Sequence, residues 1–578
     1  MACSKVLLGN CPELTDDIIQ YFRDDIPTLH SCILVNKFWC QISIPLLWKD
    51  PFSMKNPKNF HFIEIYLQKI NEKDKTQLNR CGINNNVFPS KTLFNYSNFI
   101  KCINTRNICS NIVNWIEIKK TFTCSKGRIF LLLIKVFIEN EAKLHTFEIE
   151  IAFKYLMSRK FFNSIFKLIL QNPKFISNIK NLKLNFNEEI VKYKFDYEFL
   201  KCFYYYCNSI SSLHIRFSEY GSFRGNHMTI ENQLSQIINS QKNLEKIIFA
   251  HDRKYLNPYY PLLYNSTIPL YNIIGNSNST NSLKIIIFYG INFEKTLHIK
   301  KAFKQLNGLE FIHILECLIF NSNFIQQIID LNKPFKLISL FIKDEFRFNS
   351  DENRNLQVEL MQLLFQKFGE YLENIRFASG IDGVIQYRAL EFINNYCKRI
   401  KFFDIYTFNI QKAQIVLDSV KIFGQNLNYF SIYVSLSRNE TNESIMEMFS
   451  RLVHVLPCKL EYLNLHFNYQ IRKNVWEVFL KNLKHIFIKK LLFKINNLFD
   501  DILPYIKEYI MKEQRTEYLA IEGRIETQSK YYYSIDWDKK ELFTMTDKLK
   551  EFESYNIKVK EYNNLYIKAY DKFIDEMY

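Results

Sequence analysis

The sequence contains none of the short motifs that usually place a catalytic group. A G-x-x-x-x-G-K-[ST] phosphate loop, a G-x-S-x-G nucleophile turn and an H-E-x-x-H metal motif are all absent from its 578 residues. The eleven histidines are dispersed, and His214, His313 and His466 fall on alternating positions of predicted strands, where surface residues are common. We therefore expect no catalytic residue, no cofactor and no enzyme activity.

Cysteine is the other residue type whose spacing could indicate chemistry. The thirteen cysteines include no C-x-x-C pair and show no regular spacing, in a chain much longer than small disulfide-stapled domains. Cys202 and Cys207 are separated by slightly more than the usual spacing of zinc ligands, and no second ligand pair accompanies them. We expect reduced, mostly buried thiols and no metal site.

The formal net charge of +17 comes from 76 basic and 59 acidic residues. Clustered Lys and Arg would indicate nucleic-acid binding, because they release counterions from a phosphate backbone. The ends are nearly neutral, since residues 1–57 hold five basic and six acidic side chains and residues 529–578 hold nine and ten. The excess is spread through a middle region rich in Lys, Asn, Ile, Phe and Tyr, so we expect no nucleic-acid partner.

Hydrophobic residues make up 47% of the chain and aromatic residues 16%, which favours an ordered protein. The N-terminus lacks the basic region and apolar run of a secretory signal. The strongest apolar stretch, residues 129–138, is short and is interrupted by Lys135. We expect a cytoplasmic or nuclear protein, or one found in both places, without a membrane partner.

Residues 11–52 form the stretch whose residue order, rather than composition, indicates one specific role. Apolar residues recur there at helical spacing in three successive segments. Thr15 is placed to cap the first helix, and Pro27 suits the first position of the second, where its missing N–H would be unpaired anyway. The third helix should end near Ile44, because the residue before Pro45 is disfavoured in helical geometry.

The order of apolar and aromatic residues in this stretch resembles an F-box, the helical module that docks on the Skp-type adaptor of SCF ubiquitin ligases. The resemblance rests on Pro12-Glu13-Leu14, Ile18-Ile19, Leu34-Val35, Trp39 and Leu47-Trp48. Cys11 stands where the family usually has leucine, and this small hydrophobic residue should weaken docking rather than abolish it. The alternative is an ordinary helical hairpin that caps a larger domain. The residues that the resemblance assigns to adaptor binding are Pro12, Leu14, Ile18, Ile19, Leu34, Val35 and Trp39.

From residue 144 onward, an apolar-x-x-apolar-x-apolar pattern returns many times, and its alternation predicts strands with one buried face. The intervals between successive first positions run from 26 residues (283 to 309) to 39 residues (244 to 283). A weaker further copy begins at Thr516. We call these first positions the repeat anchors: Leu144, Ile179, Ile210, Leu244, Leu283, Leu309, Leu337, Leu372, Ile400, Leu427, Leu460 and Ile488.

Between the repeat anchors the apolar residues change to helical spacing. One strand and one helix per period is typical of leucine-rich repeats, which stack into a solenoid with parallel strands on its inner face. The regular Asn or Cys that ends the family's strand motif is absent, so the repeats are degenerate. The alternative is a doubly wound α/β domain, which also alternates strands and helices.

The predicted fold class is thus α/β, with a small N-terminal helical F-box-like module followed by a leucine-rich-repeat-like solenoid. Four regions follow from this prediction. They are an F-box-like module at residues 1–57, a helical bridge at 58–143, the solenoid at 144–528 and a C-terminal cap or tail at 529–578. A solenoid needs its last apolar face covered, and the tail is expected to cover it.

The second, fourth and sixth residues after each repeat anchor should line the inner strand face. These residues are polar in the early repeats and largely aromatic in the later ones, where the patch is too extensive to stay exposed on a soluble monomer. Either a target protein or the C-terminal tail covers the patch, unless both faces of the sheet are buried. The predicted target-binding residues are Phe311, His313, Phe341, Arg376, Tyr406, Tyr429, Tyr433 and Tyr462.

The resemblance and the repeats together predict a non-catalytic substrate-recognition adaptor. Its partners would be a Skp-type adaptor, a cullin scaffold reached through that adaptor, and a protein target that the sequence does not identify. The rival hypothesis is a repeat scaffold or nucleic-acid-binding solenoid with no role in ubiquitin ligation.

Overall fold

The computed structural model spans the 578-residue chain, which divides into two compact units. Unit 1 comprises residues 1–286 and 305–309, and unit 2 comprises residues 287–304 and 310–578. The structure describes residues 12–575 except for 55–56, 58, 84, 90, 120–124, 151–158, 187–196, 218–226, 252–280, 292, 294–298, 318–321, 344–350, 379–380, 382, 408–409, 436–440, 469, 497–501, 528–535 and 570.

The described part of unit 1 starts with three short helices, which we call the N-terminal module: α2 (Pro12–Tyr21), α3 (Ile26–Ile33) and α4 (Lys37–Leu47). Side-chain caps set the starts of the second and third helices. Asp25 accepts a hydrogen bond from the backbone N–H of Thr28 at 3.1 Å, and Asn36 accepts one from that of Trp39 at 2.9 Å. Pro27 lies in the first turn of α3, as the sequence predicts.

Two helix ends in the N-terminal module differ from the prediction. Helix α2 already begins at Pro12, so Thr15 is a buried residue inside the helix rather than its cap. Helix α4 continues through Pro45 to Leu47. A proline in the last turn removes a single backbone hydrogen bond, and the Trp48 N–H still bonds to the carbonyl of Ile44 at 3.0 Å.

Four helices and a short strand follow in the predicted bridge: α5 (His61–Leu67), α6 (Glu72–Asn79), β1 (Cys102–Asn104), α7 (Thr105–Lys119) and α8 (Lys126–Glu139). Strand β1 is too short to show a period and was missed by the sequence prediction; it pairs in parallel with β2. Glu64 of α5 is buried and joins that helix to α7. It accepts a hydrogen bond from Trp115 Nε1 at 3.0 Å and pairs with Lys119 Nζ at 3.0 Å.

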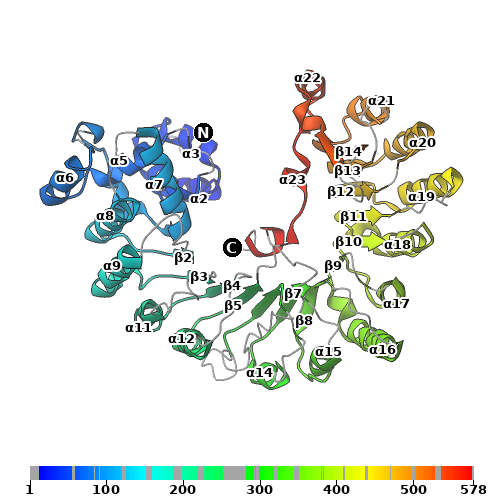
Figure 1. Ribbon diagram of the computed structural model, residues 1–578, viewed down its shortest axis with the longest axis horizontal. Coiled ribbons are helices and arrows are strands. Elements are labelled where there is room, and N and C mark those ends of the chain that lie inside the picture. The colour runs from blue at the N-terminus through cyan, green and yellow to red at the C-terminus, as the bar shows by residue number, and fades with distance from the viewer. Residues whose placement is uncertain are drawn as a thin grey trace. The chain divides into compact units, whose positions relative to one another are not determined.

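The repeats of unit 1 contribute parallel strands in chain order. Their register aligns Thr146 with Asn181, Asn181 with Ser212, and Ser212 with Lys246. Figure 1 shows the helices of this unit along one side of its strands. The elements are β2 (Thr146–Glu150), α9 (Arg159–Gln171), β3 (Asn181–Phe186), α11 (Lys201–Tyr206), β4 (Ser212–Phe217), α12 (His227–Ser240) and β5 (Lys246–His251); β6 (Ile285–Tyr289) spans the sequence boundary between the units.

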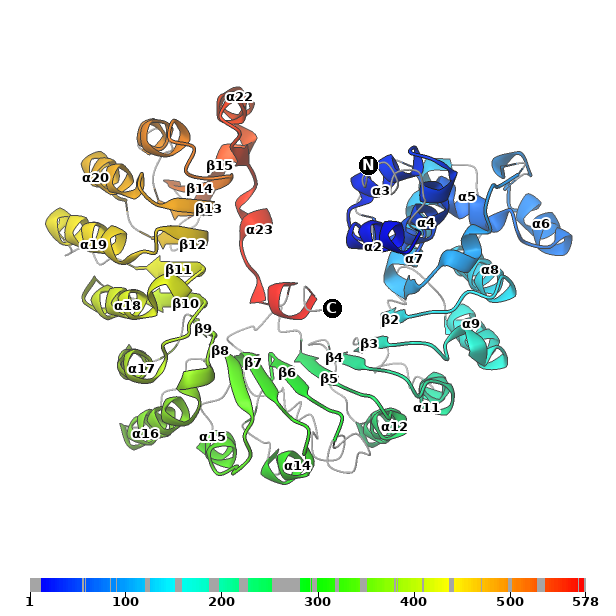
Figure 2. The same ribbon diagram turned by 180° about the vertical axis from the view of Figure 1, so that it is seen from behind.

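Unit 2 continues the same alternation, and the helices between its strands again lie along one side of the strands (Figure 2). The strands from β7 to β14 pair in parallel with their sequence neighbours. Its elements are β7 (Phe311–Cys317), α15 (Ser322–Ile329), β8 (Lys336–Ile342), α16 (Asp351–Phe368), β9 (Asn374–Phe377), α17 (Gly383–Tyr396), β10 (Phe402–Thr407), α18 (Ile410–Phe423), β11 (Tyr429–Val434), α19 (Asn442–Val455), β12 (Lys459–Phe467), α20 (Lys473–Leu483), β13 (Phe487–Ile495), α21 (Leu503–Ile506) and β14 (Tyr518–Thr527); α14 (Ile299–Gln305) crosses the boundary between the units.

These elements confirm the predicted fold class, with N-terminal helices followed by a leucine-rich-repeat-like solenoid of one strand and one helix per repeat. All twelve repeat anchors, from Leu144 to Ile488, are buried at or just before a strand. A doubly wound domain would carry its connecting helices on both faces of the sheet, whereas in each unit here the helices between successive repeat strands lie on one face. The proposed region boundaries stay predictions.

The C-terminal tail packs onto β14 in unit 2. Strand β15 (Asp536–Glu541) pairs with β14 antiparallel, and β16 (Lys558–Val559) pairs with it in parallel. Helix α22 (Thr546–Ser554) lies between them in sequence. After β16 come the single-turn helix α23 (Tyr562–Leu565) and a π-helical turn, Asp571–Asp575. We call residues 561–574 the strap.

Candidate interaction surfaces

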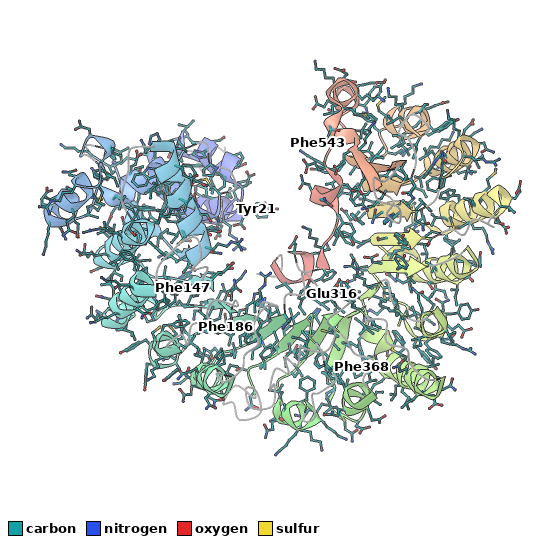
Figure 3. The ribbon with its side chains drawn as sticks, in the orientation of Figure 1. Tyr21, Phe147, Phe186, Glu316, Phe368 and Phe543 are labelled. Atoms are coloured by element: carbon teal, nitrogen blue, oxygen red, sulfur yellow. The ribbon has the colours of Figure 1, made fainter. Side chains whose placement is uncertain are left out.

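The N-terminal module exposes large apolar side chains at the positions that the sequence assigns to adaptor binding. Leu34 is 86% exposed, Leu14 is 50% exposed and Val35 is 46% exposed. Pro12 is also exposed, and Ile18 is half-buried. Tyr21, which the sequence analysis did not single out, is 86% exposed and projects from the end of α2 (Figure 3).

The exposed Leu34 and Val35 lie on an ordered turn between α3 and α4. The N–H of Leu34 donates to the carbonyl of Ser31 at 3.1 Å, and that of Val35 donates to Cys32 at 3.2 Å. Asn36 then caps the next helix. The backbone therefore holds both apolar side chains in place at the surface.

Two residues predicted to contact the adaptor face the core of the module instead. Ile19 is fully buried and Trp39 is 8% exposed, and both pack with Leu29 and Cys32. Their assignment to adaptor binding rests on the resemblance and stays a prediction, although in this chain both side chains pack inward. Their packing supports the exposed turn from beneath.

The inner strand face of unit 2 carries the predicted aromatic residues in register. Phe402 lies beside Tyr429, and Tyr429 lies beside Tyr462, on neighbouring strands. A second row, two residues further along the strands, places Arg376 beside Asp404. The aromatic side chains therefore form a continuous row next to a row of polar and charged residues.

The strap covers both rows, which corresponds to the tail alternative considered above. The Phe573 ring packs edge-on against Phe341 at 4.9 Å and against Phe402 at 5.2 Å between centroids. Lys572 Nζ lies 4.0 Å from the ring centroid of Tyr429. Tyr462 is buried together with Tyr562 of the strap.

Arg376 is the centre of a half-buried ion cluster beneath the strap. Its guanidinium contacts Glu316 at 2.7 Å and Asp404 at 3.0 Å, and Nη2 donates to the hydroxyl of Tyr566 at 2.8 Å. Burial opposes the charged guanidinium, but the two carboxylates raise the pKa of Arg376 above its usual value. Burial raises the pKa of Asp404, an effect that the neighbouring guanidinium counteracts.

The remaining predicted target residues lie on either side of this cluster. His313 is buried, and its Nδ1 lies 2.9 Å from the hydroxyl of Ser339. Phe311 is half-buried, with Lys336 Nζ 5.9 Å from its ring centroid. The half-buried rings of Tyr406 and Tyr433 stack with centroids 3.9 Å apart. The assignment of all eight residues to target binding stays a prediction.

Sequence reasoning missed the residues that complete this site. Glu316 reaches Arg376 from a backbone position with φ of +55°, a conformation that no apolar pattern indicates. Figure 3 labels Glu316 on the strand side of unit 2. The strap aromatics Tyr562, Tyr566 and Phe573 recur at intervals of four and seven residues. That spacing was the feature of the sequence from which the strap residues could have been found.

The strand face of unit 1 is polar, as predicted for the early repeats. Asn185 donates to Glu148 at 3.2 Å, and Arg106 pairs with Glu150 at 2.7 Å. His214 is buried in the same face, and burial lowers its pKa, with Lys183 adding to the effect. These groups form ion pairs and hydrogen bonds along the strands.

The Cys202 and Cys207 thiols are buried in unit 1, and both donate to backbone carbonyls. The acceptors are Phe199 at 2.6 Å and Ile176 at 3.1 Å. Burial raises the pKa of Cys207 to about 12, which disfavours the thiolate that zinc requires. Within the described residues, no group of three or more His, Cys, Asp or Glu side chains is arranged to hold a metal ion.

Comparisons with known proteins add little to this geometry. No family model matches the sequence, and no curated protein matches it. Among solved structures, the chain is similar to one described as "Crystal structure of Rad7 and Elc1 complex in yeast". The TM-score is 0.27 and the identity 14%, over 72% of this chain and 78% of that chain. A similarity of this size supports no inference. No helix in the described part of the chain is long and apolar enough to cross a membrane.

Proposed function

We propose that this chain is a non-catalytic substrate-recognition adaptor with an F-box-like N-terminal module. The module docks on a Skp-type adaptor, and the repeats bind a protein target. Ubiquitin transfer is carried out by other subunits, which a cullin scaffold brings together. The proposal places the protein in the cytoplasm, the nucleus or both.

The observation that carries the proposal is the exposed apolar surface of the N-terminal module. The module has a buried core of its own, and it still exposes the large apolar side chains of Leu14, Leu34 and Val35. When a partner covers apolar residues that are exposed to water, the burial of their surface lowers the free energy of the complex. The F-box resemblance assigns these three positions to adaptor docking, and they remain accessible.

The test measures the affinity of the full chain for a purified Skp-type adaptor. Replacing Leu14 and Leu34 together by alanine should weaken binding by about 2 kcal/mol or more, roughly thirtyfold, because apolar residues at the centre of an interface dominate its energy. Both side chains are exposed, so the circular dichroism spectrum and melting temperature should stay the same.

A matched control is available in the same unit. Leu93 is 92% exposed but lies outside the N-terminal module. Leu93→Ala makes the same leucine-to-alanine change at one exposed position and should leave the affinity unchanged. Full binding by the Leu14→Ala/Leu34→Ala variant, or equal losses in the variant and the control, would reject the docking surface.

A further inference from the structure

The strap crosses the strand face of unit 2 nearly from one end to the other. Strand β16 fixes its start, because Lys558 and Val559 pair with Tyr518 and Leu519 of β14. From there the strap passes over β12, where the Tyr562 hydroxyl donates to Asn464 Oδ1 at 2.8 Å. Its far end reaches Phe341 of β8. Figure 1 shows α23 and the final turn in red beside these strands.

The strap has an inward side and an outward side. Tyr562, Ala569, Phe573 and Ile574 are buried, whereas the intervening residues 561, 563, 564, 568 and 571 are exposed. It has a single helical turn near each end, and residues 566–568 between them have no helix or strand. A short two-sided segment of this kind binds through a few inward side chains, as a peptide ligand does.

The strand face beneath the strap has the composition of a binding site rather than of a core. Asn464 is buried among the aromatic rings, and the half-buried side chains of Arg376 and Asp404 are 16% and 14% exposed. Interfaces are enriched in aromatic residues and arginine, and buried polar groups fix the orientation of a ligand. The strap satisfies two of these groups with tyrosine hydroxyls, at Arg376 and at Asn464.

The charge of the strand face indicates which kind of segment can bind there. The cluster around Arg376 contains one cation and the carboxylates of Glu316 and Asp404, which leaves one negative charge in excess. The strap places one neutral hydroxyl, that of Tyr566, against this cluster, and the ammonium of Lys572 lies 4.0 Å from the ring centroid of Tyr429. An acidic segment would be repelled, whereas an aromatic segment with a lysine is accepted.

We infer that this face is the target-binding surface and that the strap occupies it as a built-in competitor. The target is an extended peptide segment that presents tyrosine hydroxyls to Arg376 and Asn464 and a Lys-Phe pair to Tyr429 and Phe341. The inference rests on the proposed function for the role of the target, but peptide binding itself does not involve a Skp-type adaptor.

The tether makes the strap a strong competitor. A segment joined to its site by a short linker is present at an effective concentration in the millimolar range. A free peptide of the same sequence should therefore bind the wild-type chain poorly. Weakening the strap within the chain should open the face to that peptide.

The experiment uses the full chain and a fluorescent synthetic peptide of residues 560–575. The strap-weakened protein carries Tyr566→Ala and Phe573→Ala, and fluorescence anisotropy measures peptide binding to this variant and to the wild type. The variant should bind the peptide at least tenfold more tightly than the wild type. Peptide that itself carries both substitutions should not bind either protein.

Two further variants keep the result interpretable. Asn563→Ala/Lys568→Ala changes exposed strap residues only and should behave as the wild type does. Adding Phe341→Ala to the strap-weakened chain should remove peptide binding, because the Phe341 ring contacts Phe573.

Failure of the peptide to bind the strap-weakened chain would overturn the inference, as would a melting temperature lowered so far that the variant is unfolded at the assay temperature. Adaptor binding, measured separately, is independent of each outcome.

Discussion

At the scale of single residues, Arg376 has the largest consequences for unit 2. Its positive charge offsets one of the two negative charges of Glu316 and Asp404. Removing Arg376 therefore leaves the two carboxylates facing each other without a cation. Breaking a buried ion pair from one side is strongly destabilising, because the remaining charge has lost both water and partner.

We therefore predict that Arg376→Met lowers the free energy of unfolding by about 3 kcal/mol or more. Tyr566→Phe removes only the hydroxyl that Arg376 bonds and should cost about 1 kcal/mol. Urea denaturation followed by circular dichroism gives both values. Equal losses in the two variants would show that the cluster is solvated and that the carboxylates need no cation.

Asp50 provides a second test at the residue scale, in unit 1. Burial raises the pKa of Asp50 from its ordinary value of 3.8 to about 6, despite hydrogen bonding from Ser53 and the nearby charge of Lys49. Because the folded-state pKa lies above the unfolded value, folding favours the protonated form. The contribution of protonated Asp50 to the stability of the folded state is fully present below pH 3.8 and is lost as the pH rises through about 6.

Asp50→Asn should consequently make unfolding less sensitive to pH. The variant should be as stable as the wild type near pH 4 and more stable at pH 8, by up to about 3 kcal/mol for two units of pKa. Melting temperatures measured across that range provide the check. A variant that loses stability at pH 8 would mean that the ionised carboxylate is the favoured form in the folded protein.

At the scale of elements, the sequence predicted repeating strands better than it predicted their partners. Leu144, Leu283 and Leu427 each precede a strand because an alternating apolar pattern has few other ways to bury one face. The same reasoning missed β1, which has three residues and gains its order from pairing with β2. Local patterns report an element's own buried face and contain little about long-range pairing.

The candidate sites, like the elements, were predicted only in part from the sequence. Residue order assigned Leu34 and Val35, which lie on an exposed turn, to the adaptor surface, and it assigned Ile19 and Trp39 to the same surface although they face inward. Residue order does not separate the two sides of a helix that is apolar on both. The strap was one of two stated alternatives, and its contacts with Arg376 join residues 190 positions apart, beyond the reach of any sequence period.

At the scale of the whole molecule, the +17 charge calls for a test of the rival function. Basic residues pair with acidic partners in both units, as Lys135 does with Asp74 in unit 1 and Lys494 does with Glu522 in unit 2. A dispersed excess of this kind attracts nucleic acid only through weak counterion release.

We predict that the full chain binds random duplex DNA with a dissociation constant of about 1 μM or weaker at roughly 0.15 M salt, within the usual non-specific range. Electrophoretic mobility shifts at several salt concentrations measure both the affinity and its salt dependence. Sub-micromolar binding at that salt concentration would favour the nucleic-acid-binding solenoid over the adaptor.

The most direct test of the central claim is hydrogen–deuterium exchange of the full chain with and without a purified Skp-type adaptor. The proposed function predicts slower exchange in α2 and in the turn between α3 and α4, around Leu34 and Val35. Strands β9–β13 and the strap should exchange at unchanged rates, since the target face is not used. Protection centred on those strands, or no protection anywhere at an adaptor concentration well above micromolar, would contradict docking through the N-terminal module.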